Sequence, residues 1–353
     1  MSFVKNINFS NGKWIWWNFP IFIVAEIWVN HNQDLDLAKK HIKAAYEAWA
    51  DAVKFQTWKT ENIILKDVEK AEYQIINTWI EESQFDMLKK LELPYKWHFE
   101  LKKYAEELWL IFFSTMEDFE SVDFLINELK IELIKVWSWD LTNLPLLKYT
   151  LSKNIPTILS TWVASEKEID KVIEIVKESW NDKIVILQCT SNYPTENKDV
   201  NLLWLEILKK YWAIIWFSNH CLDNVSDVLA IWMWSKFIEK HFTLDKDLEW
   251  PDHKASLNPQ EFKEFVDLVR KSEIILWKKE KKVLNCVQST KKLIERRLVA
   301  KKDIEKWNIL TLDDLEYKRA NKWIFSSNID KYLWKKINIK LKKWEVILDK
   351  YFD

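Results

Sequence analysis

Two lysines and two histidines stand in or just after short apolar runs of this 353-residue sequence. Lys54 and Lys135 each lie within such a run, His220 follows another, and His241 lies in the last of them. Two ammonium groups beside hydroxyl side chains suit a ligand that carries phosphate and carboxylate groups. Two imidazoles could hold one divalent metal ion and leave coordination positions open for a substrate.

Many other polar residues share this place at the end of an apolar run. They are Glu26, Asn30, His31, Gln56, Ser114, Thr115, Ser138, Asp140, Ser160, Thr161, Gln188, Thr190, Ser191, Tyr193, Ser218, Asn219 and Lys240. Each has a plainer alternative: a strand-end lysine is more often a solvated charge, and a carboxylate such as Glu26 can cap a helix or join an ion pair. Their recurrence at seven or eight run ends favours one shared site.

The elements that must position these residues follow an alternating pattern. Eight runs are nearly continuous in apolar residues, as strands buried on both faces are, and are expected at 22–27, 52–57, 111–115, 133–136, 156–161, 184–189, 214–219 and 237–242. Amphipathic helices are expected between them, for example at 35–48, 165–179 and 258–271. Eight strands that alternate with helices predict an α/β fold, a (β/α)8 TIM barrel with its chemistry at the carboxyl ends of the strands.

The chain is expected to divide into three parts. Residues 1–275 form the predicted barrel, 276–295 a charged linker and 296–353 a small second domain. The second domain shows short β-like pieces at 298–300, 315–318 and 337–339. It is too short to bury a large core of its own.

Composition excludes several classes of protein. Lys and Arg number 53 against 54 Asp and Glu, which argues against a general nucleic-acid binder. We expect no membrane span, because no apolar run reaches about 18 residues, and the amino terminus lacks a signal-peptide core. The three cysteines, Cys189, Cys221 and Cys286, show no CxxC spacing, which favours a reducing cytoplasm.

Tryptophan is abundant and glycine almost missing. The sequence holds one Gly and 24 Trp, whereas an average soluble chain has about 7% Gly. Several tryptophans stand at predicted strand ends, just past predicted helix ends or in turns, where glycine is usual: Trp28, Trp137, Trp139, Trp162, Trp216, Trp49, Trp180, Trp307 and Trp344. We therefore predict that most Trp occupy glycine positions, as a UGA codon meant as glycine but translated as tryptophan would produce. The alternative is a non-catalytic, Trp-rich sugar-binding module.

Longer stretches resemble the sialic acid synthases. The segment AEIWVNHNQDLDLAKKHIKAAYEAWADAVKFQT is similar to the family's AEIGVNHNGD…AGADAVKFQT, KVWSWDLTNLPLL to KIGSGDLTNLPLL, ILSTWVAS to ILSTGMAS, and IIWFSNHCLD to IGFSDHTLG. FIEKHFTLDKDLEWPDHKASLNP resembles the family's EKHFTLD…GPDHxASL, and RRLVAKKDIEKWNILTLDDLEYKRANKWI resembles its antifreeze-like (SAF) domain. The resemblance covers nearly the whole chain, and in most motifs Trp replaces the family's Gly. Trp14, Trp58 and Trp97 are less clear.

The resemblance implies a reaction. Phosphoenolpyruvate would condense with an N-acetylated amino-sugar aldehyde of the N-acetylmannosamine type, giving a nonulosonic (sialic-type) acid and phosphate. A 2,4-diacetamido-6-deoxy-mannose substrate, which would give N,N'-diacetyllegionaminate, is the alternative. The implied cofactor is a divalent metal, usually manganese, with magnesium or cobalt as alternatives, and the implied assembly is a domain-swapped homodimer.

The resemblance also assigns roles to residues. It implies that His220 and His241 hold the metal, and that Glu26 is the candidate acid/base or partner of a metal-held water. The residues implied to hold phosphoenolpyruvate are Lys54, Thr115, Lys135, Ser138, Ser160, Ser191 and Ser218. Those implied to bind the sugar side are Gln56, Tyr193, Asp252 and Arg319, with Asp140 where some members have Glu. Arg319 would reach from the second domain into a partner subunit's barrel.

Some positions depart from the family's pattern. Asn219 replaces an Asp before the first metal-binding histidine, and we expect this to weaken the orientation of His220. Met116–Glu117 replaces Pro-Phe after the third predicted strand, and Ala320–Asn321 replaces Pro-Gly after Arg319. A Schiff-base aldolase that uses Lys54 or Lys135 is a second enzymatic hypothesis.

Overall fold

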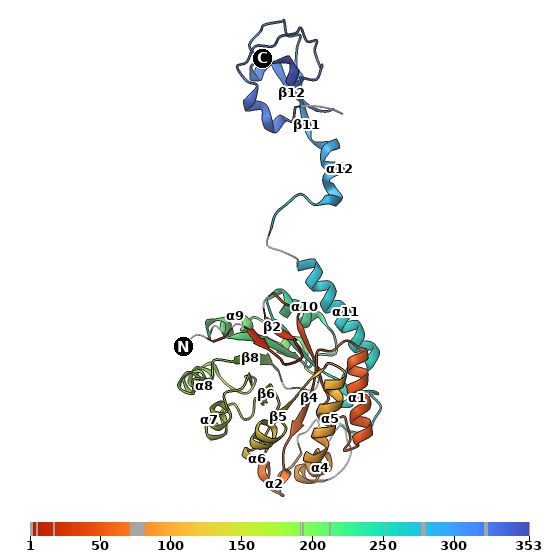
Figure 1. Ribbon diagram of the computed structural model, residues 1–353, viewed down its shortest axis with the longest axis vertical. Coiled ribbons are helices and arrows are strands. Elements are labelled where there is room, and N and C mark those ends of the chain that lie inside the picture. Colours follow the sequence, from red (N-terminus) through yellow and green to blue (C-terminus); the bar gives the residue numbers. More distant parts are fainter. Residues whose placement is uncertain are drawn as a thin grey trace. The chain divides into compact units, whose positions relative to one another are not determined.

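The computed structural model describes residues 3–4, 6–16, 18–70, 82–190, 192, 194–211, 213–250, 252–276, 280–320 and 324–352. Within them the chain forms two compact units, Met1–Trp277 and Lys278–Asp353. The first unit carries the strands and helices of the predicted barrel, drawn in red to cyan in Figure 1. The second unit is described separately below.

The first unit is a closed barrel of eight parallel strands, which confirms the predicted (β/α)8 fold. Its strands are β3 (Phe22–Glu26), β4 (Ala52–Thr57), β5 (Ile111–Met116), β6 (Ile134–Val136), β7 (Thr157–Ser160), β8 (Ile184–Cys189), β9 (Ile214–Asn219) and β10 (Phe237–His241). Each strand pairs with its neighbour in the sequence, and β10 pairs with β3 to close the ring, with His241 opposite Glu26. All eight strands are buried throughout, because helices cover their outer faces.

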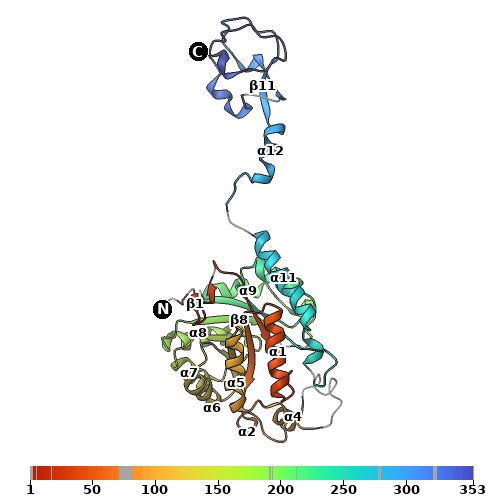
Figure 2. The ribbon, with the colours of Figure 1, turned by 45° about the vertical axis from the view of Figure 1, so that its right-hand side comes forward.

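Helices surround the barrel, as Figures 1 and 2 show from two directions. They are α1 (Leu35–Glu47), α2 (Thr60–Ile63), α4 (Gln84–Leu91), α5 (Tyr95–Glu107), α6 (Phe119–Asp123), α7 (Leu144–Ser152), α8 (Glu166–Glu178), α9 (Trp204–Leu208), α10 (Val225–Trp232) and α11 (Pro259–Leu276). The predicted capping pair of α8 forms, since the Ser165 backbone N–H donates to the Glu168 carboxylate at 2.7 Å. Helix α11 runs five residues beyond the predicted 271, because Arg270 and Glu273 near its end hydrogen-bond to the backbone of Ile21.

A two-stranded hairpin precedes the barrel and was not expected from the sequence. Strands β1 (Asn6–Asn8) and β2 (Trp14–Trp16) pair antiparallel. Ile7 and Ile15 pack with Phe22 and Phe237, which begin β3 and β10. The hairpin therefore lies at the amino-terminal end of the barrel, opposite the end where this fold carries its chemistry.

The second unit has a small core of its own. Strands β11 (Arg296–Ala300) and β12 (Leu315–Arg319) pair antiparallel, which confirms two of the three predicted β-like pieces. The third, at 337–339, is wrong as a strand, because it makes only a single bridge between Ile337 and Phe352. Helix α12 (Asn285–Ile294) occupies part of the expected linker, and none of its residues is buried.

Tryptophans hold most of the left-handed backbone positions. Of the fourteen described non-glycine residues with positive φ, nine are Trp: Trp28, Trp49, Trp109, Trp180, Trp234, Trp250, Trp307, Trp334 and Trp344. The single glycine, Gly12, also has positive φ, in the turn of the β1–β2 hairpin. A left-handed conformation costs a residue with a side chain about 1–2 kcal/mol, and a folded domain is stable by only about 5–15 kcal/mol. Nine such tryptophans therefore oppose folding by an amount comparable to that stability.

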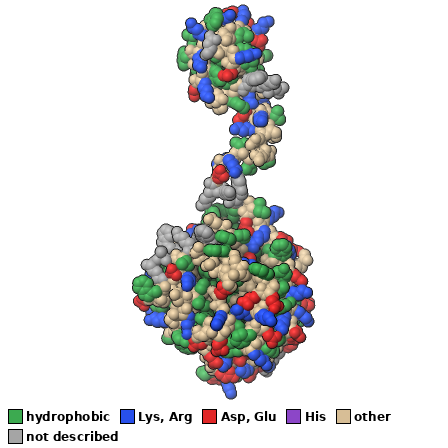
Figure 3. Space-filling model, viewed as in Figure 1, with side chains coloured by type: hydrophobic (Ala, Val, Ile, Leu, Met, Phe, Trp, Pro, Cys, Tyr) green, Lys and Arg blue, Asp and Glu red, His purple; other side chains and the backbone are tan. Residues whose placement is uncertain are grey.

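The surface of the barrel mixes the two signs of charge. On the face drawn in Figure 3, Lys and Arg side chains alternate with Asp and Glu side chains. The sequence's near balance of charges is thus also seen locally on this face. Within the described part of the chain, no helix combines the length and apolar character needed to cross a bilayer.

The buried His98 of α5 predicts a stability that falls in acid. Its Nε2 accepts a hydrogen bond from the Thr57 hydroxyl at 2.8 Å, and burial lowers its pKa to about 4. The unfolded state takes up the proton first as the pH falls, so stability is complete above about pH 6.5 and is lost towards pH 4, by about 3 kcal/mol for this residue. We expect His98→Gln to lessen this loss in urea unfolding at pH 7, 5.5 and 4.5. An unchanged pH dependence would contradict the assignment.

Candidate active site

One small cavity collects most of the predicted site residues at the carboxyl ends of the strands. It has a volume of about 10 Å³. Eight predicted site residues line it: Lys54, Gln56, Thr115, Lys135, Ser160, Ser218, His220 and His241. Glu26 forms an ion pair with Lys54 and is also fully buried. The convergence arises because parallel strands of a closed barrel end on one rim and alternate residues point inward.

Four charged groups form an ion network at this cavity. The Lys135 ammonium lies 2.6 Å from one Glu239 carboxylate oxygen, and the Lys54 ammonium lies 3.8 Å from the other. Lys54 also forms an ion pair with Glu26, and Ser218 donates a hydrogen bond to Glu239 at 3.0 Å. All four charged residues are almost completely removed from solvent. Their pairing compensates for the cost of burying isolated charges.

Glu239 was missed by the sequence analysis. The signal was available, because residues two apart on a strand face the same side and Glu239 precedes His241 by two positions. The same alternation turns Lys240 outward, where it donates to the Cys221 carbonyl and pairs with Asp227. Lys240 therefore lies outside the cavity, although the sequence analysis grouped it with the other polar residues at strand ends.

The network sets the protonation of its members. Burial alone would raise the pKa of Glu239, but Lys135 and Lys54 lower it to about 2. For Lys54, burial lowers the pKa and outweighs the attraction of Glu239 and Glu26, which would raise it. For Lys135, the same two carboxylates outweigh burial, and the pKa is raised. Burial raises the pKa of Glu26. Glu239 is thus the fixed anion, and Lys135 the firmly charged cation.

The two predicted metal ligands stand side by side. The ring centroids of His220 and His241 are 5.0 Å apart. His220 donates from Nδ1 to the Thr190 carbonyl at 2.6 Å, and His241 donates from Nδ1 to the Asp252 carboxylate at 2.8 and 2.9 Å. A proton fixed on Nδ1 leaves the lone pair on Nε2, which is how metal-binding histidines are usually held.

Two further predictions concern residues next to the histidines. The Asp252 carboxylate, expected to contact the sugar, hydrogen-bonds His241, Asn30 and Ser256, and its contact with the sugar stays a prediction. Asn219, expected to weaken the orientation of His220, points outward and donates to Asp227 at 2.8 Å. The His220 ring is held by the Thr190 carbonyl, whereas Asn219 accepts a hydrogen bond from the Cys221 backbone N–H at 2.8 Å and so contacts the chain next to His220 and not the ring.

The other predicted site residues lie in different surroundings. Ser138 is buried, as is Ser160 in the cavity, and neither hydroxyl has a hydrogen-bond partner among the described residues. Asp140 accepts a hydrogen bond from Asn143 at 3.2 Å, just before α7. Arg319 is exposed on β12 of the second unit. Ser191 and Tyr193 lie outside the described residues.

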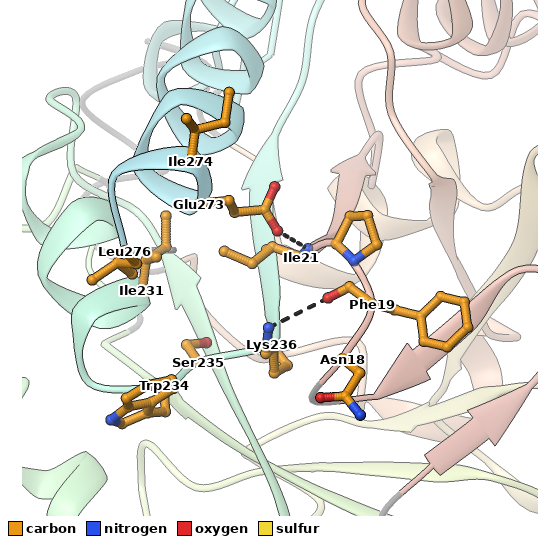
Figure 4. A pocket seen from close by; sticks show the side chains of 11 residues that line it. Asn18, Phe19, Ile21, Ile231, Trp234, Ser235, Lys236, Glu273, Ile274 and Leu276 are labelled. Atoms are coloured by element: carbon orange, nitrogen blue, oxygen red, sulfur yellow. Dashed lines mark hydrogen bonds between the residues drawn. The ribbon is translucent and has the colours of Figure 1, made fainter. Parts of the chain in front are cut away.

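A larger cavity of about 390 Å³ lies at the other end of the barrel, before the starts of β3 and β10 (Figure 4). Its charged groups are occupied: Glu273 accepts from the Ile21 backbone, and Lys236 donates to the Phe19 carbonyl at 3.3 Å (Figure 4). Enzymes of this fold carry their chemistry at the carboxyl ends of the strands. The smaller, charged cavity is therefore the better candidate despite its size.

Comparison with known proteins assigns the family. Residues 41–281 match the model of the NeuB family. The chain belongs to the NeuB family. It is 39% identical to the N,N'-diacetyllegionaminic acid synthase of Legionella pneumophila over 93% of both chains, and 33% identical to the human N-acetylneuraminate-9-phosphate synthase over 97% of this chain and 95% of that one. The crystal structure of a sialic acid synthetase from Leptospira borgpetersenii matches with a TM-score of 0.71 and 29% identity, covering 82% of this NeuB-family chain and 96% of the other.

The ion network predicts a non-additive response to mutation. Glu239→Gln leaves Lys135 buried without its anion and should lower the free energy of unfolding by about 3–5 kcal/mol. Lys135→Met should have a similar effect for the converse reason. The double variant removes both charges, so its loss should be smaller than the sum of the single losses. Urea unfolding of the four proteins measures this, and strictly additive losses would contradict the ion pair.

Proposed function

We propose that this chain condenses phosphoenolpyruvate with an N-acetylated amino-sugar aldehyde and releases phosphate, forming a nonulosonic acid. The observation that carries the proposal is the placement of two buried lysines, Lys54 and Lys135, beside hydroxyl groups at the carboxyl end of the barrel. The names of the NeuB-family relatives support the same class of reaction.

Phosphoenolpyruvate fits the chemistry of the small cavity. It carries a phosphate and a carboxylate, which the ammonium groups of Lys54 and Lys135 can neutralise. The hydroxyls of Ser138 and Ser160 are buried without partners among the described residues, and such groups call for a bound polar group. We assign Thr115, Ser191 and Ser218 to the same ligand. Glu26, fully buried beside Lys54, is the proposed acid/base.

A divalent metal fits the histidine pair. The two rings lie 5.0 Å apart, and each Nδ1 donates to a fixed oxygen, which leaves Nε2 as the coordinating atom. No described group of three or more His, Cys, Asp or Glu is arranged to hold a metal ion, so further ligands must come from the substrate or solvent. Bound there, manganese, magnesium or cobalt would supply a Lewis acid for the aldehyde oxygen.

The chain's own residues orient the two substrates. We propose that the lysines hold the enol so that its methylene carbon faces the aldehyde carbon, and a C–C bond forms between them. Water then adds at C2 of the former enol, the C2–O bond to phosphate breaks, and the oxygen from water becomes the keto group. Glu26 would give its proton to the aldehyde oxygen and take one from the water, whose other proton leaves with the phosphate. Gln56, Asp140 and Tyr193 are the proposed sugar contacts. Asp252 is a positioning residue, because its carboxylate holds the His241 ring.

The identity of the sugar has two candidates. N-Acetylmannosamine is the first, and a 2,4-diacetamido-6-deoxy-mannose is the second. The Legionella relative favours the second, because it is named a legionaminic acid synthase and shares 39% identity. Both sugars are therefore tested in the assay below.

Phosphate release tests the proposed function. The assay uses the chain with glycine at the tryptophans where the family motifs carry Gly, and supplies phosphoenolpyruvate, manganese and each sugar in turn. We expect release only when a sugar is present, and loss of release with chelator or in His220→Ala. A covalent adduct trapped by borohydride at Lys54 or Lys135 would contradict the proposal in favour of a Schiff-base aldolase. Sugar binding by the tryptophan form without metal or turnover would favour the binding module.

A swapped homodimer is also part of the proposal. The resemblance to the family implies that Arg319 reaches the barrel of a partner subunit, and we infer the swap from it. His220→Ala lacks a working barrel but retains Arg319, and Arg319→Ala has the reverse defect. Mixing the two inactive variants should therefore restore phosphate release by building a composite site. No recovery after subunit exchange, shown by native mass spectrometry, would contradict the swap.

A further inference from the structure

The ends of three helices show what backbone the tryptophans occupy. After α1, the Trp49 N–H donates to the Tyr46 carbonyl and the Ala50 N–H to the Ala45 carbonyl, at 2.9 and 3.0 Å. Trp109 after α5 and Trp234 after α10 sit in the same pair of hydrogen bonds. This is the helix stop that places a left-handed residue, usually glycine, one position past the cap. The backbone at these stops is thus built for glycine.

The side chains at these stops gain little from packing. Trp49 and Trp109 are 68% and 67% exposed, and Trp180, with φ of 60° just past α8, is 82% exposed. In the second unit, Trp334 and Trp344 have φ of 67° and 73° and are also exposed. Large apolar rings on the surface do not offset the strain of their backbone. Burial therefore gives no reason for tryptophan at these positions.

Inside the barrel, Trp216 has no room. This residue of β9 is completely buried, and its ring centroid lies 2.9 Å from that of Phe237 on β10. Aromatic pairs prefer centroid separations of about 4.5–7 Å. The indole N–H of Trp216 also has no hydrogen-bond partner among the described residues. Overfilling of this kind disturbs a close-packed core.

At the mouth of the barrel, tryptophan rings gather beside the candidate active site. Trp28 lies 6.3 Å from Trp137, Trp137 lies 5.8 Å from Trp139, and Trp139 lies 6.4 Å from Trp162, between ring centroids. Trp28 also stands edge-on to His241, at 5.9 Å. Trp137 lines the small cavity, whose volume is about 10 Å³. Ligand pockets usually measure about 300–1,000 Å³, so the cavity beside these rings is too small for two substrates.

Trp58 provides the contrast. It is buried, its indole N–H donates to the Thr60 hydroxyl at 3.2 Å, and it packs with Met87 and Leu91 in a cluster that also includes Trp28. It is not among the residues with positive φ. Its environment is that of an ordinary buried tryptophan. The structure thus separates two kinds of tryptophan position, although the sequence prints the same letter for both.

We propose that the working protein has glycine at the nine left-handed tryptophans, at Trp216 and at the mouth residues Trp137, Trp139 and Trp162, whereas Trp58 is a true tryptophan. Glycine would relax the backbone of the first set and remove the clash with Phe237 in the barrel. Glycine at the mouth would also turn the space now filled by rings into the entrance for the second, sugar substrate. This last consequence alone rests on the proposed function.

The codons of the gene give the first test. We expect UGA at the thirteen positions assigned to glycine and UGG at Trp58. UGG at the left-handed positions would overturn the proposal. Intact mass and peptide sequencing of the protein from its own cells supply the matching protein-level result, with glycine expected in peptides that span 49, 109 and 234.

Stability gives a second test that does not depend on activity. We compare three proteins: the chain with all 24 tryptophans, called the printed chain, the chain with glycine at all thirteen positions, and the thirteen-glycine chain with Trp58→Gly added. The thirteen-glycine chain should melt at a higher Tm than the printed chain, or fold where the printed chain is insoluble. Adding Trp58→Gly should lower the Tm, because it removes a packed and hydrogen-bonded ring. A printed chain as stable as the thirteen-glycine chain would overturn the proposal.

Single restorations of tryptophan in the thirteen-glycine chain locate the effects. Tryptophan at 49 or 109 should lower the Tm by a few degrees and leave phosphate release unchanged. Tryptophan at 137 or 139 should abolish sugar-dependent phosphate release with little change in Tm. Full release with a ring at 137 or 139 would contradict the mouth as the entrance. A stable thirteen-glycine chain that releases no phosphate with any sugar would contradict the proposed function instead.

Discussion

The buried ion network of Lys54, Lys135, Glu26 and Glu239 is the constraint on which the site depends. Each charge is removed from solvent, so each needs its partners. The pairing holds two ammonium groups at fixed places near the rim, with the Glu239 carboxylate ionised between them. A ligand with a phosphate and a carboxylate would share these ammonium groups with Glu26 and Glu239. Such preorganised charge is what favours an anionic transition state.

The barrel supplies the geometry of this network through closure and alternation. Glu239 and Lys135 are 104 positions apart along the chain. Their strands end on one rim because β10 pairs with β3 to close the ring. The hydrogen bonds from His220 to Thr190 and from His241 to Asp252 then fix the two imidazoles next to the network. The two imidazoles and the two ammonium groups thus lie at the same rim of the barrel.

The sequence predicted the eight strands because short, continuous apolar runs are typical of strands that are buried on both faces. It also predicted most of the residues that line the small cavity, since polar residues at such run ends must converge in a closed barrel. It could not predict the hydrogen-bond partners of Asp252, because a motif identifies a residue but not the groups that its carboxylate contacts. Glu239 was overlooked although strand alternation would have placed it with His241. The β1–β2 hairpin was missed because three-residue strands leave little periodic signal.

Two observations on the tryptophans support the proposal that many of them stand at glycine positions. Nine described tryptophans have positive φ, and the ring of Trp216 lies 2.9 Å from that of Phe237 between centroids. Both are independent of the glycine-poor composition. If the proposal holds, glycine at the mouth of the barrel opens the way to the ion network.

A crystal structure of the glycine form, soaked with phosphoenolpyruvate and manganese, tests the central claim most directly. The account predicts the phosphate and carboxylate within hydrogen-bonding distance of Lys54 and Lys135, with the hydroxyls of Ser138 and Ser160 as further donors, and the metal between His220 and His241. Phosphoenolpyruvate bound at the opposite end of the barrel, or a metal held without either histidine, would contradict it.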